Sequence, residues 1–327
     1  MGGSYAAAGA DTIGRESHMN IRKAAALALF LAGAAAAATC GGHGTRESLF
    51  VSTQWLADHI KDANLVVLAV GEKADYDAGH IAGSVFIEYG SVGVKGESGL
   101  MLELPPMDKL AEVFSKLGVG NDSRVVVYRL KDWLTQAART ILTLDAMGLG
   151  KNAAMLDASL ATWKEEGRAT SGATSKDAPV VQPGKLTPCP RSDVIADLDF
   201  VKAHLHRAGV RILDARDPKV YSGETVRTGM APGHIQGAGN VHYNGLLDEK
   251  TGKLKPVEEL QAKFRDAGVK PGDRVVTYCF IGQQASALYL VSRYLGYDTR
   301  LYDGSWDEWS RHPELPVESA ATAGEKK

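Results

Sequence analysis

The chain has 327 residues, of which 44% are hydrophobic and 23% charged, a composition typical of soluble globular proteins. This length suits two domains of ordinary size plus a leader segment. A formal net charge of −2 gives no basis for binding nucleic acid or an anionic membrane surface. The three cysteines, Cys40, Cys189 and Cys279, lack the spacing of a metal site and are too few for a disulfide framework. We therefore expect no metal, no cofactor and no nucleic-acid partner.

Residues 1–40 have the features of a secretory signal. Met19 begins a short basic segment and is the better start of such a signal, and an apolar, alanine-rich run follows over residues 24–38. The run is shorter than a membrane-spanning helix of about 20 residues. Cys40 stands where a lipoprotein would be acylated, but Ala37-Ala38-Thr39 is a poor lipobox. We predict export, to a periplasm, with cleavage and release favoured over a lipid anchor at Cys40.

Apolar periodicity predicts an alternation of strands and helices along the rest of the chain. In the first half, a capped helix begins at Ser52, a second helix covers residues 110–117, and strands are expected at 64–70, 85–87, 124–128 and 153–156. In the second half, a helix is expected over Ser192–His204, strands at Val210–Asp214 and Arg274–Tyr278, and a helix that runs through Ala287 to Leu290. Loops containing Gly-His-Ile are expected at residues 76–84 and 232–238.

The two halves are copies of one unit. Met107–Arg129 aligns without gaps to Val257–Cys279, and the strand residues Arg-Val-Val are identical in both copies. We predict an α/β fold of two domains, each a mostly parallel sheet flanked by helices. The expected boundaries are 48–167 for the first domain, 168–190 for an exposed linker rich in Gly, Ser, Thr and Pro, 191–318 for the second domain and 319–327 for a tail.

Cys279 is the candidate nucleophile. It follows a buried strand and precedes a tight glycine loop that opens a helix, so backbone N–H groups are expected to point at its sulfur. We expect these groups to lower the thiol pKa and to stabilise a thiolate or persulfide; an inert buried cysteine is the alternative. The first copy has Arg129 at this position, so we expect that copy to be catalytically inactive. Arg129 is more easily interpreted as a solvated or interface arginine than as an anion-binding residue.

Four motifs on this duplicated frame carry a resemblance to a known family. They are Leu213-Asp214-Ala215-Arg216, Gly233-His234-Ile235, Tyr278-Cys279-x-x-Gly282-x-x-Ala285-Ser286, and Tyr302-Asp303-Gly304-Ser305-Trp306-x-Glu308-Trp309. In this order and spacing, the chain resembles the tandem-domain rhodaneses, the thiosulfate and 3-mercaptopyruvate sulfurtransferases. The resemblance covers residues of about 50 to 317.

The resemblance implies a double displacement at Cys279, whose thiolate takes the outer sulfur of thiosulfate as sulfite leaves. The persulfide would be held by the loop residues Phe280, Ile281, Gly282, Gln283, Gln284 and Ala285 until cyanide or a thiol removes the sulfur. Family members also bind the anionic donor with arginines, for which Arg227 is the best match, with Lys219 as a second cation. The expected partners are thus a small anionic donor and a thiol or cyanide acceptor, and we expect a monomer.

The donor is less well determined than the nucleophile. Thiosulfate enzymes of the animal type carry basic residues after the loop cysteine and mercaptopyruvate enzymes carry small ones, whereas this chain has Phe280 and Ile281. We place thiosulfate first, 3-mercaptopyruvate second, and a non-catalytic persulfide carrier as the alternative of another class. A phosphatase is excluded, because its Cys-x5-Arg loop would need an arginine where Ala285 stands.

Structural support for the site is predicted from Asp214, Arg216, His234 and Trp306. Asp214 and Arg216 are expected to form an ion pair at the end of a strand. His234 has a counterpart, His80, in the first copy, so a hydrogen-bonding role in a turn is favoured over general-base catalysis. Trp306 is expected to line the core or the pocket.

Overall fold

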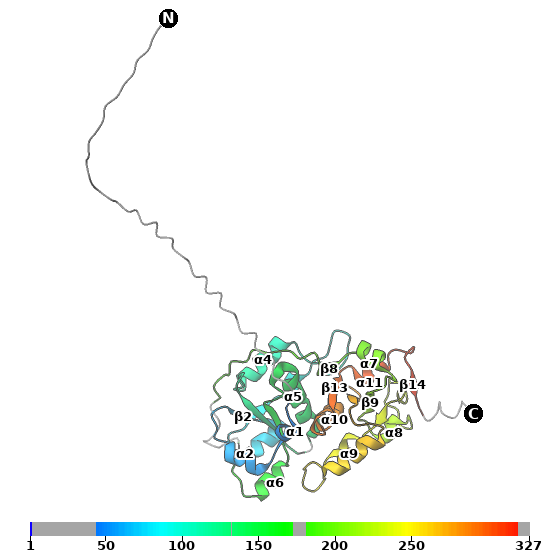
Figure 1. Cartoon of the computed structure of the whole chain (residues 1–327). Helices are drawn as coiled ribbons and strands as arrows, with labels where there is room; N and C mark the ends of the chain where they lie inside the picture. Colours follow the sequence, from blue (N-terminus) through cyan, green and yellow to red (C-terminus); the bar gives the residue numbers. More distant parts are fainter. Residues whose placement is uncertain (2–43, 132, 173–180, 320–327) are drawn as a thin grey trace, which may run out of the picture. The chain divides into compact units, whose positions relative to one another are not determined.

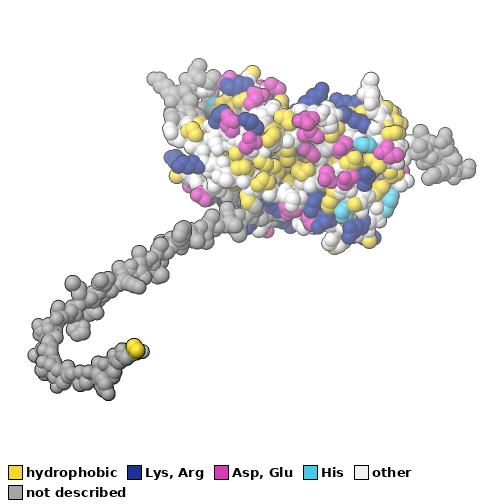
Figure 2. Space-filling view, turned by 90° about the horizontal axis from the view of Figure 1, so that it is seen from above, with side chains coloured by type: hydrophobic (Ala, Val, Ile, Leu, Met, Phe, Trp, Pro, Cys, Tyr) yellow, Lys and Arg dark blue, Asp and Glu magenta, His cyan; other side chains and the backbone are white. Residues whose placement is uncertain are grey.

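The computed structural model describes Met1 and residues 44–131, 133–172 and 181–319. The predicted signal with Cys40, and the tail from residue 320, lie outside this part of the chain. In the part that is described, no helix is long and apolar enough to span a membrane. Basic and acidic side chains are interspersed on the face of the molecule seen in Figure 2.

The first copy alternates helices with the strands of one main sheet (Figure 1). In chain order it has α1 (Arg46–Leu49), β1 (Phe50–Val51), α2 (Thr53–His59), β2 (Leu65–Val70), α3 (Lys73–Ala78), β3 (His80–Ile81), β4 (Val85–Ile87), the 3₁₀ helix η1 (Tyr89–Val92), α4 (Met107–Lys116), β5 (Arg124–Arg129), α5 (Leu134–Leu144), the π-helix η2 (Asp145–Leu149), β6 (Ala153–Leu156), α6 (Leu160–Glu165) and β7 (Thr170–Ser171).

The second copy follows the same plan. In chain order it has β8 (Ile195–Ala196), α7 (Leu198–His204), β9 (Val210–Asp214), α8 (Pro218–Tyr221), β10 (His234–Ile235), β11 (Gly239–Asn240), the 3₁₀ helix η3 (Tyr243–Leu246), α9 (Val257–Asp266), β12 (Arg274–Tyr278), α10 (Gln283–Tyr294), β13 (Asp298–Tyr302), α11 (Ser305–Trp309) and β14 (Val317–Glu318).

Each copy contains a five-stranded sheet in which every neighbouring pair is parallel. The strand order is β1-β6-β5-β2-β4 in the first copy and, read from the matching edge, β8-β13-β12-β9-β11 in the second. Central strands such as β12 consist largely of buried Val, Thr and Tyr side chains, as expected for a parallel sheet that is covered on both faces. The prediction of two α/β domains with parallel sheets flanked by helices is confirmed.

Several local predictions need correction. The helix expected over Ser192–His204 begins only at Leu198, because β8 pairs with β13 and the Asp197 carboxylate accepts a hydrogen bond from the Phe200 N–H as an N-cap. The Gly-His-Ile segments are not wholly loop, since β3 and β10 are short strands that pair antiparallel with β7 and β14. Strand β7 lies in the segment that was expected to be a free linker.

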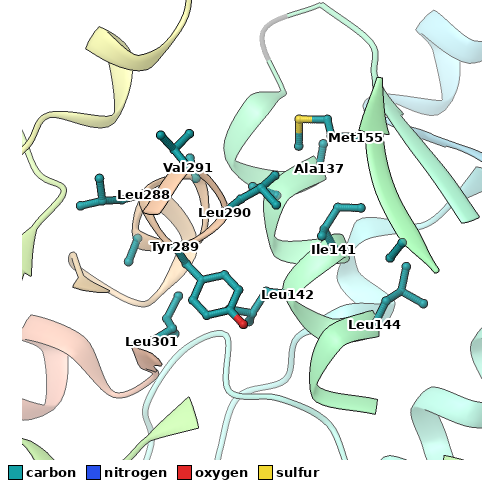
Figure 3. Packing of buried hydrophobic residues seen from close by; sticks show 14 of the residues in the cluster. Ala137, Ile141, Leu142, Leu144, Met155, Leu288, Tyr289, Leu290, Val291 and Leu301 are labelled. Atoms are coloured by element: carbon teal, nitrogen blue, oxygen red, sulfur yellow. The ribbon is translucent and has the colours of Figure 1, made fainter. Parts of the chain in front are cut away.

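The two copies share a hydrophobic core in which α5 packs against α10 (Figures 1 and 3). Figure 3 shows Tyr289 and Leu290 of α10 directed toward Ile141 and Leu142 of α5. The Tyr289 hydroxyl continues across the interface and donates a hydrogen bond of 2.6 Å to the buried carboxylate of Asp145. This shared core joins the copies into one unit.

Each copy also extends a hairpin onto the other. The first hairpin spans residues 94–103 and the second spans residues 247–254, and each is closed by an antiparallel bridge between its ends. Just after the first hairpin, the backbone N–H of Leu104 donates a hydrogen bond of 3.1 Å to the carboxylate of Asp303 in the second copy. At the equivalent position of the second hairpin, the backbone N–H of Leu254 donates a hydrogen bond of 2.7 Å to the carboxylate of Asp157 in the first copy.

Two arginines of the first copy bind carbonyl oxygens of the two hairpins. Arg139 of the first copy donates from Nη2 to the carbonyl oxygen of Leu102 (2.6 Å), and Arg129 donates from Nη2 to that of Gly252 (2.7 Å). Leu102 and Gly252 occupy equivalent hairpin positions and both have a left-handed backbone, with φ of 64° and 66°. Arg129 is 5% exposed, so the expectation of an interface arginine is the one that the fold supports.

Candidate active site

The carboxyl ends of three neighbouring strands converge on Cys279. Strand β12 lies between β9 and β13, and all three run parallel. Asp214 ends β9, Cys279 follows β12, and Asp303 follows β13. In an open parallel sheet this edge is where ligands bind, because the loops that leave the strands meet there. The strand, loop and helix expected around Cys279 are present as β12, residues 279–282 and α10.

Cys279 is the free cysteine of the described chain, and its side chain is fully buried. Backbone N–H groups of Ile281, Gln284 and Ala285 donate hydrogen bonds to its sulfur. Its own N–H donates to the Ser305 hydroxyl over 3.3 Å. These contacts form the cradle of fixed dipoles predicted from the sequence, and Ser305 is a supporting residue that the sequence analysis did not single out.

The cradle depends on Gly282, whose φ of 83° places it in the left-handed region at the N-cap of α10. A Cβ at this position would lie 3.0 Å from Nη1 of Arg139 and 3.0 Å from Oδ1 of Asp303. The Ser286 hydroxyl donates to the Gly282 carbonyl oxygen over 2.8 Å and fixes the turn. Both the backbone conformation and the lack of space therefore require glycine here.

The prediction that the loop lowers the thiol pKa is wrong for the net effect. Burial raises the pKa of the Cys279 thiol above its ordinary value, and this desolvation outweighs the N–H groups of Ala285, Ile281 and Gln284, which act in the opposite direction. The negative charge of Asp214 raises the pKa further. The N–H groups therefore favour a sulfur anion, while burial favours the neutral thiol of Cys279.

Asp214 and Arg216 form the predicted ion pair beneath the loop. Arg216 donates from Nη2 to one carboxylate oxygen over 2.5 Å and from Nε to both oxygens at 2.9 and 3.0 Å. Both side chains are buried, and the guanidinium lies over the rings of Trp306 and Phe280 with centroid distances of 4.6 and 5.2 Å. A second Arg216 bond, to the Gly233 carbonyl oxygen, ties the Gly-His segment to the site.

The two cations predicted to bind the donor lie in different settings. Arg227 is exposed, and its guanidinium lies 5.1 Å from the ring centroid of Phe280, the residue next to Cys279. Lys219 is also exposed, but its ammonium pairs with Glu224 at 3.3 Å. Arg227 therefore remains the better candidate for an anionic donor, and Lys219 has a competing partner of its own.

His234 and Trp306 have structural contacts. Nδ1 of His234 lies 2.8 Å from the carbonyl oxygen of Tyr221, and the two rings stack at 3.7 Å. His80 makes the same contacts with Tyr76 in the first copy, so this pattern belongs to the repeat and not to the chemistry. Burial lowers the pKa of His234, which keeps the ring neutral. Trp306 is buried and donates from Nε1 to the carbonyl oxygen of Ala231.

The first copy reaches into this site, which the sequence analysis did not foresee. Arg139 of α5 is fully buried and donates from Nη1 to Oδ1 of Asp303 over 2.6 Å. Nearby, the Gln283 amide donates to the Thr135 hydroxyl over 3.1 Å. Arg139 and Tyr289 occupy equivalent positions of the repeat, and in the structure both side chains cross to an aspartate of the other copy.

The equivalent place in the first copy is a cavity. Its volume is about 570 Å³, and its lining includes Arg129, Tyr243 and Gln283. Within the described ranges, no three His, Cys, Asp or Glu side chains are arranged to hold a metal ion. Cys189 is disulfide-bonded.

Comparisons with known proteins identify relatives of both copies. The profile of the rhodanese-like domain matches residues 52–166 and 197–312. A thiosulfate sulfurtransferase from Azotobacter vinelandii is 30% identical over 259 residues, covering 78% of this chain and 91% of the relative. The sulfur carrier protein TtuD from Thermus thermophilus is 28% identical over 284 residues, covering 82% of this chain and 96% of the relative. Among solved structures, the 3-mercaptopyruvate sulfotransferase SseA from Escherichia coli matches with a TM-score of 0.67 at 26% identity, covering 79% of this chain and 99% of that one.

Proposed function

Because this chain belongs to the rhodanese family of sulfurtransferases, we propose that it moves a sulfane sulfur from thiosulfate to cyanide or a thiol acceptor through a persulfide on Cys279. The observation that carries the proposal is the free cysteine at the end of β12 whose sulfur accepts three backbone N–H groups. Fixed dipoles of this kind stabilise a sulfur anion without rearranging during the reaction.

The reaction has two balanced steps. After Cys279 loses its proton, its thiolate attacks the outer sulfur of thiosulfate; the new S–S bond forms as the old one breaks, and sulfite leaves with the electron pair. The acceptor then attacks the outer sulfur of the persulfide, and the Cys279 thiolate is released. One nucleophile thus serves two substrates in turn, which gives ping-pong kinetics.

The second copy is the catalytic one in this proposal, and the first copy is inactive. Arg129 stands in place of the cysteine and is bound to the Gly252 carbonyl oxygen, so that position has no nucleophile. Arg227 is the proposed cation for the donor, supported by its position over the ring of Phe280.

Mass spectrometry tests the proposal directly. Incubation with thiosulfate should add the mass of one sulfur atom to Cys279, and Cys279→Ser should lose both the adduct and turnover with cyanide. A wild-type Cys279 that stays unmodified refutes the proposal. A persulfide that forms but does not turn over with cyanide or thiols favours the alternative of a sulfur carrier, such as the Thermus relative by its name.

3-Mercaptopyruvate is the alternative donor, consistent with the likeness to SseA. Side-by-side kinetics with both donors decide between them, since a higher kcat/KM for 3-mercaptopyruvate removes thiosulfate from first place. The exposed Lys219 would have to leave Glu224 to bind the carboxylate of that donor.

We also propose that the protein is an exported, periplasmic monomer. The basic segment at Met19 and the apolar run after it support export. Cell fractionation tests the location, and a lipid anchor at Cys40 would instead place the protein in the membrane fraction. Sedimentation of the purified chain tests the monomer.

A further inference from the structure

The hydroxyl of Tyr89 is a buried polar group without a partner in the described part of the chain. Tyr89 begins η1 in the first copy, and its ring meets that of Trp133 edge to face, with centroids 6.2 Å apart. Buried hydroxyls are nearly always hydrogen-bonded, so an unpaired one needs a physical explanation.

Tyr89 belongs to the surroundings of Cys279 even though it comes from the other copy. Its side chain packs against the hydrophobic core cluster that contains Cys279, and the charged or ionisable groups that act on its phenol are Arg139 on α5, Cys279 after β12 and Asp303 after β13. Arg139 lies against the loop that follows Cys279, because a Cβ added to Gly282 would be 3.0 Å from its Nη1 atom. The Nε–H of this fully buried arginine also lacks a partner among the described residues. Two unused donors from the first copy therefore lie beside the cysteine loop.

We propose that the Tyr89 hydroxyl donates a hydrogen bond to the anionic end of the sulfur donor when its outer sulfur meets Cys279. The first copy would then supply one wall of the donor site, with Arg139 as a positioning residue that holds Asp303 and Gly282 in place. This assignment rests on the proposed sulfurtransferase function and extends it to a residue outside the catalytic copy.

The chemistry suits an anion with oxygen acceptors. Burial raises the pKa of the Tyr89 phenol well above its ordinary value. The positive charge of Arg139 acts in the opposite direction but is the smaller effect, so the phenol keeps its proton at neutral pH. A neutral phenol donates to a sulfonate or carboxylate oxygen through a short, charge-assisted bond. Both thiosulfate and 3-mercaptopyruvate offer such oxygens, so the proposal does not depend on which donor is preferred.

Tyr89→Phe is the informative variant, because it keeps the ring and its contact with Trp133. Loss of a hydrogen bond to a charged ligand should lower kcat/KM for thiosulfate by about tenfold or more. The kcat/KM for cyanide should stay unchanged, because the acceptor reacts with the persulfide after the donor anion has left. The unfolding midpoint should stay equal or rise, since the hydroxyl has no partner in the folded protein to lose.

Tyr243→Phe is the matched control. Tyr243 begins η3, the equivalent 3₁₀ helix of the second copy, and it lines the cavity at Arg129. This change should leave both kcat/KM values unaltered.

The outcomes separate the two proposals. If wild-type protein forms no persulfide on Cys279, the proposed function fails and the Tyr89 assignment fails with it. If wild-type protein forms the persulfide but Tyr89→Phe leaves kcat/KM for thiosulfate unchanged, the assignment alone is overturned. An equal fall for thiosulfate and cyanide also overturns it, because the change would then act on the cysteine loop and not on the donor.

Discussion

The buried ion pair between the copies should make a large contribution to stability. Arg139 is fully buried, and the Asp303 side chain is 13% exposed; their charged atoms lie 2.6 Å apart. Arg139→Met retains a long, unbranched side chain but removes the donors to Asp303 and to the Leu102 carbonyl oxygen. Breaking a buried pair costs roughly 3–5 kcal/mol, because one charge stays behind without its partner. Asp303 still accepts a hydrogen bond from the N–H of Leu104, so we expect Arg139→Met to lower the free energy of unfolding by about 3 kcal/mol, the low end of this range.

Urea unfolding followed by tryptophan fluorescence and circular dichroism measures this loss of free energy. The matched control is Arg274→Met, because Arg274 and Asp298 are also an arginine–aspartate pair, at 2.7 Å, but with side chains 37% and 49% exposed. An exposed pair of this kind contributes about 1 kcal/mol or less. Asp303→Asn in the Arg139→Met background should recover part of the loss by removing the stranded charge. Equal losses for Arg139→Met and Arg274→Met would refute the reasoning.

Two further predictions concern the chemistry. Because burial raises the pKa of the Cys279 thiol, the thiolate fraction and the single-turnover rate of persulfide formation should still be rising with pH at about 8.5, the ordinary cysteine value. A rate that is already level below that pH would show that the loop N–H groups prevail after all. Arg227→Ala should raise KM for thiosulfate several-fold, whereas Lys219→Ala should leave it unchanged because Lys219 is exposed and paired with Glu224. Steady-state kinetics that give the same KM change for both variants would contradict the assignment of Arg227.

The frame of the molecule could be predicted because its signals are local. Strands β2, β9 and β12 are short segments rich in apolar residues, and the gapless match of Met107–Arg129 to Val257–Cys279 shows that one unit occurs twice. The N–H cradle around Cys279 also follows from local sequence, since a strand, a left-handed glycine and a helix start are adjacent along the chain.

The net effect on the thiol could not be predicted, because it depends on how completely other segments cover the sulfur. The motif reveals the N–H groups of Ile281 and Ala285, but not the burial that outweighs them. Contacts such as Arg139 with Asp303 join residues far apart in different copies, so no local pattern announces them. The pairing of Lys219 with Glu224, within the same segment, was not predicted either, and a role of Lys219 in donor binding stays a prediction.

The crossed hairpins bear on how the duplication has been retained. A gene encoding only the second copy would produce a domain whose Asp303 faces solvent in place of the first hairpin and Arg139. The first copy, cut free, would lose the N–H that the second hairpin donates to Asp157. The first copy, which has Arg129 where the second has Cys279, thus has a structural role, because each copy covers polar groups of the other. The two copies therefore depend on each other for burial of these groups, and neither is expected to keep its own fold intact when expressed alone.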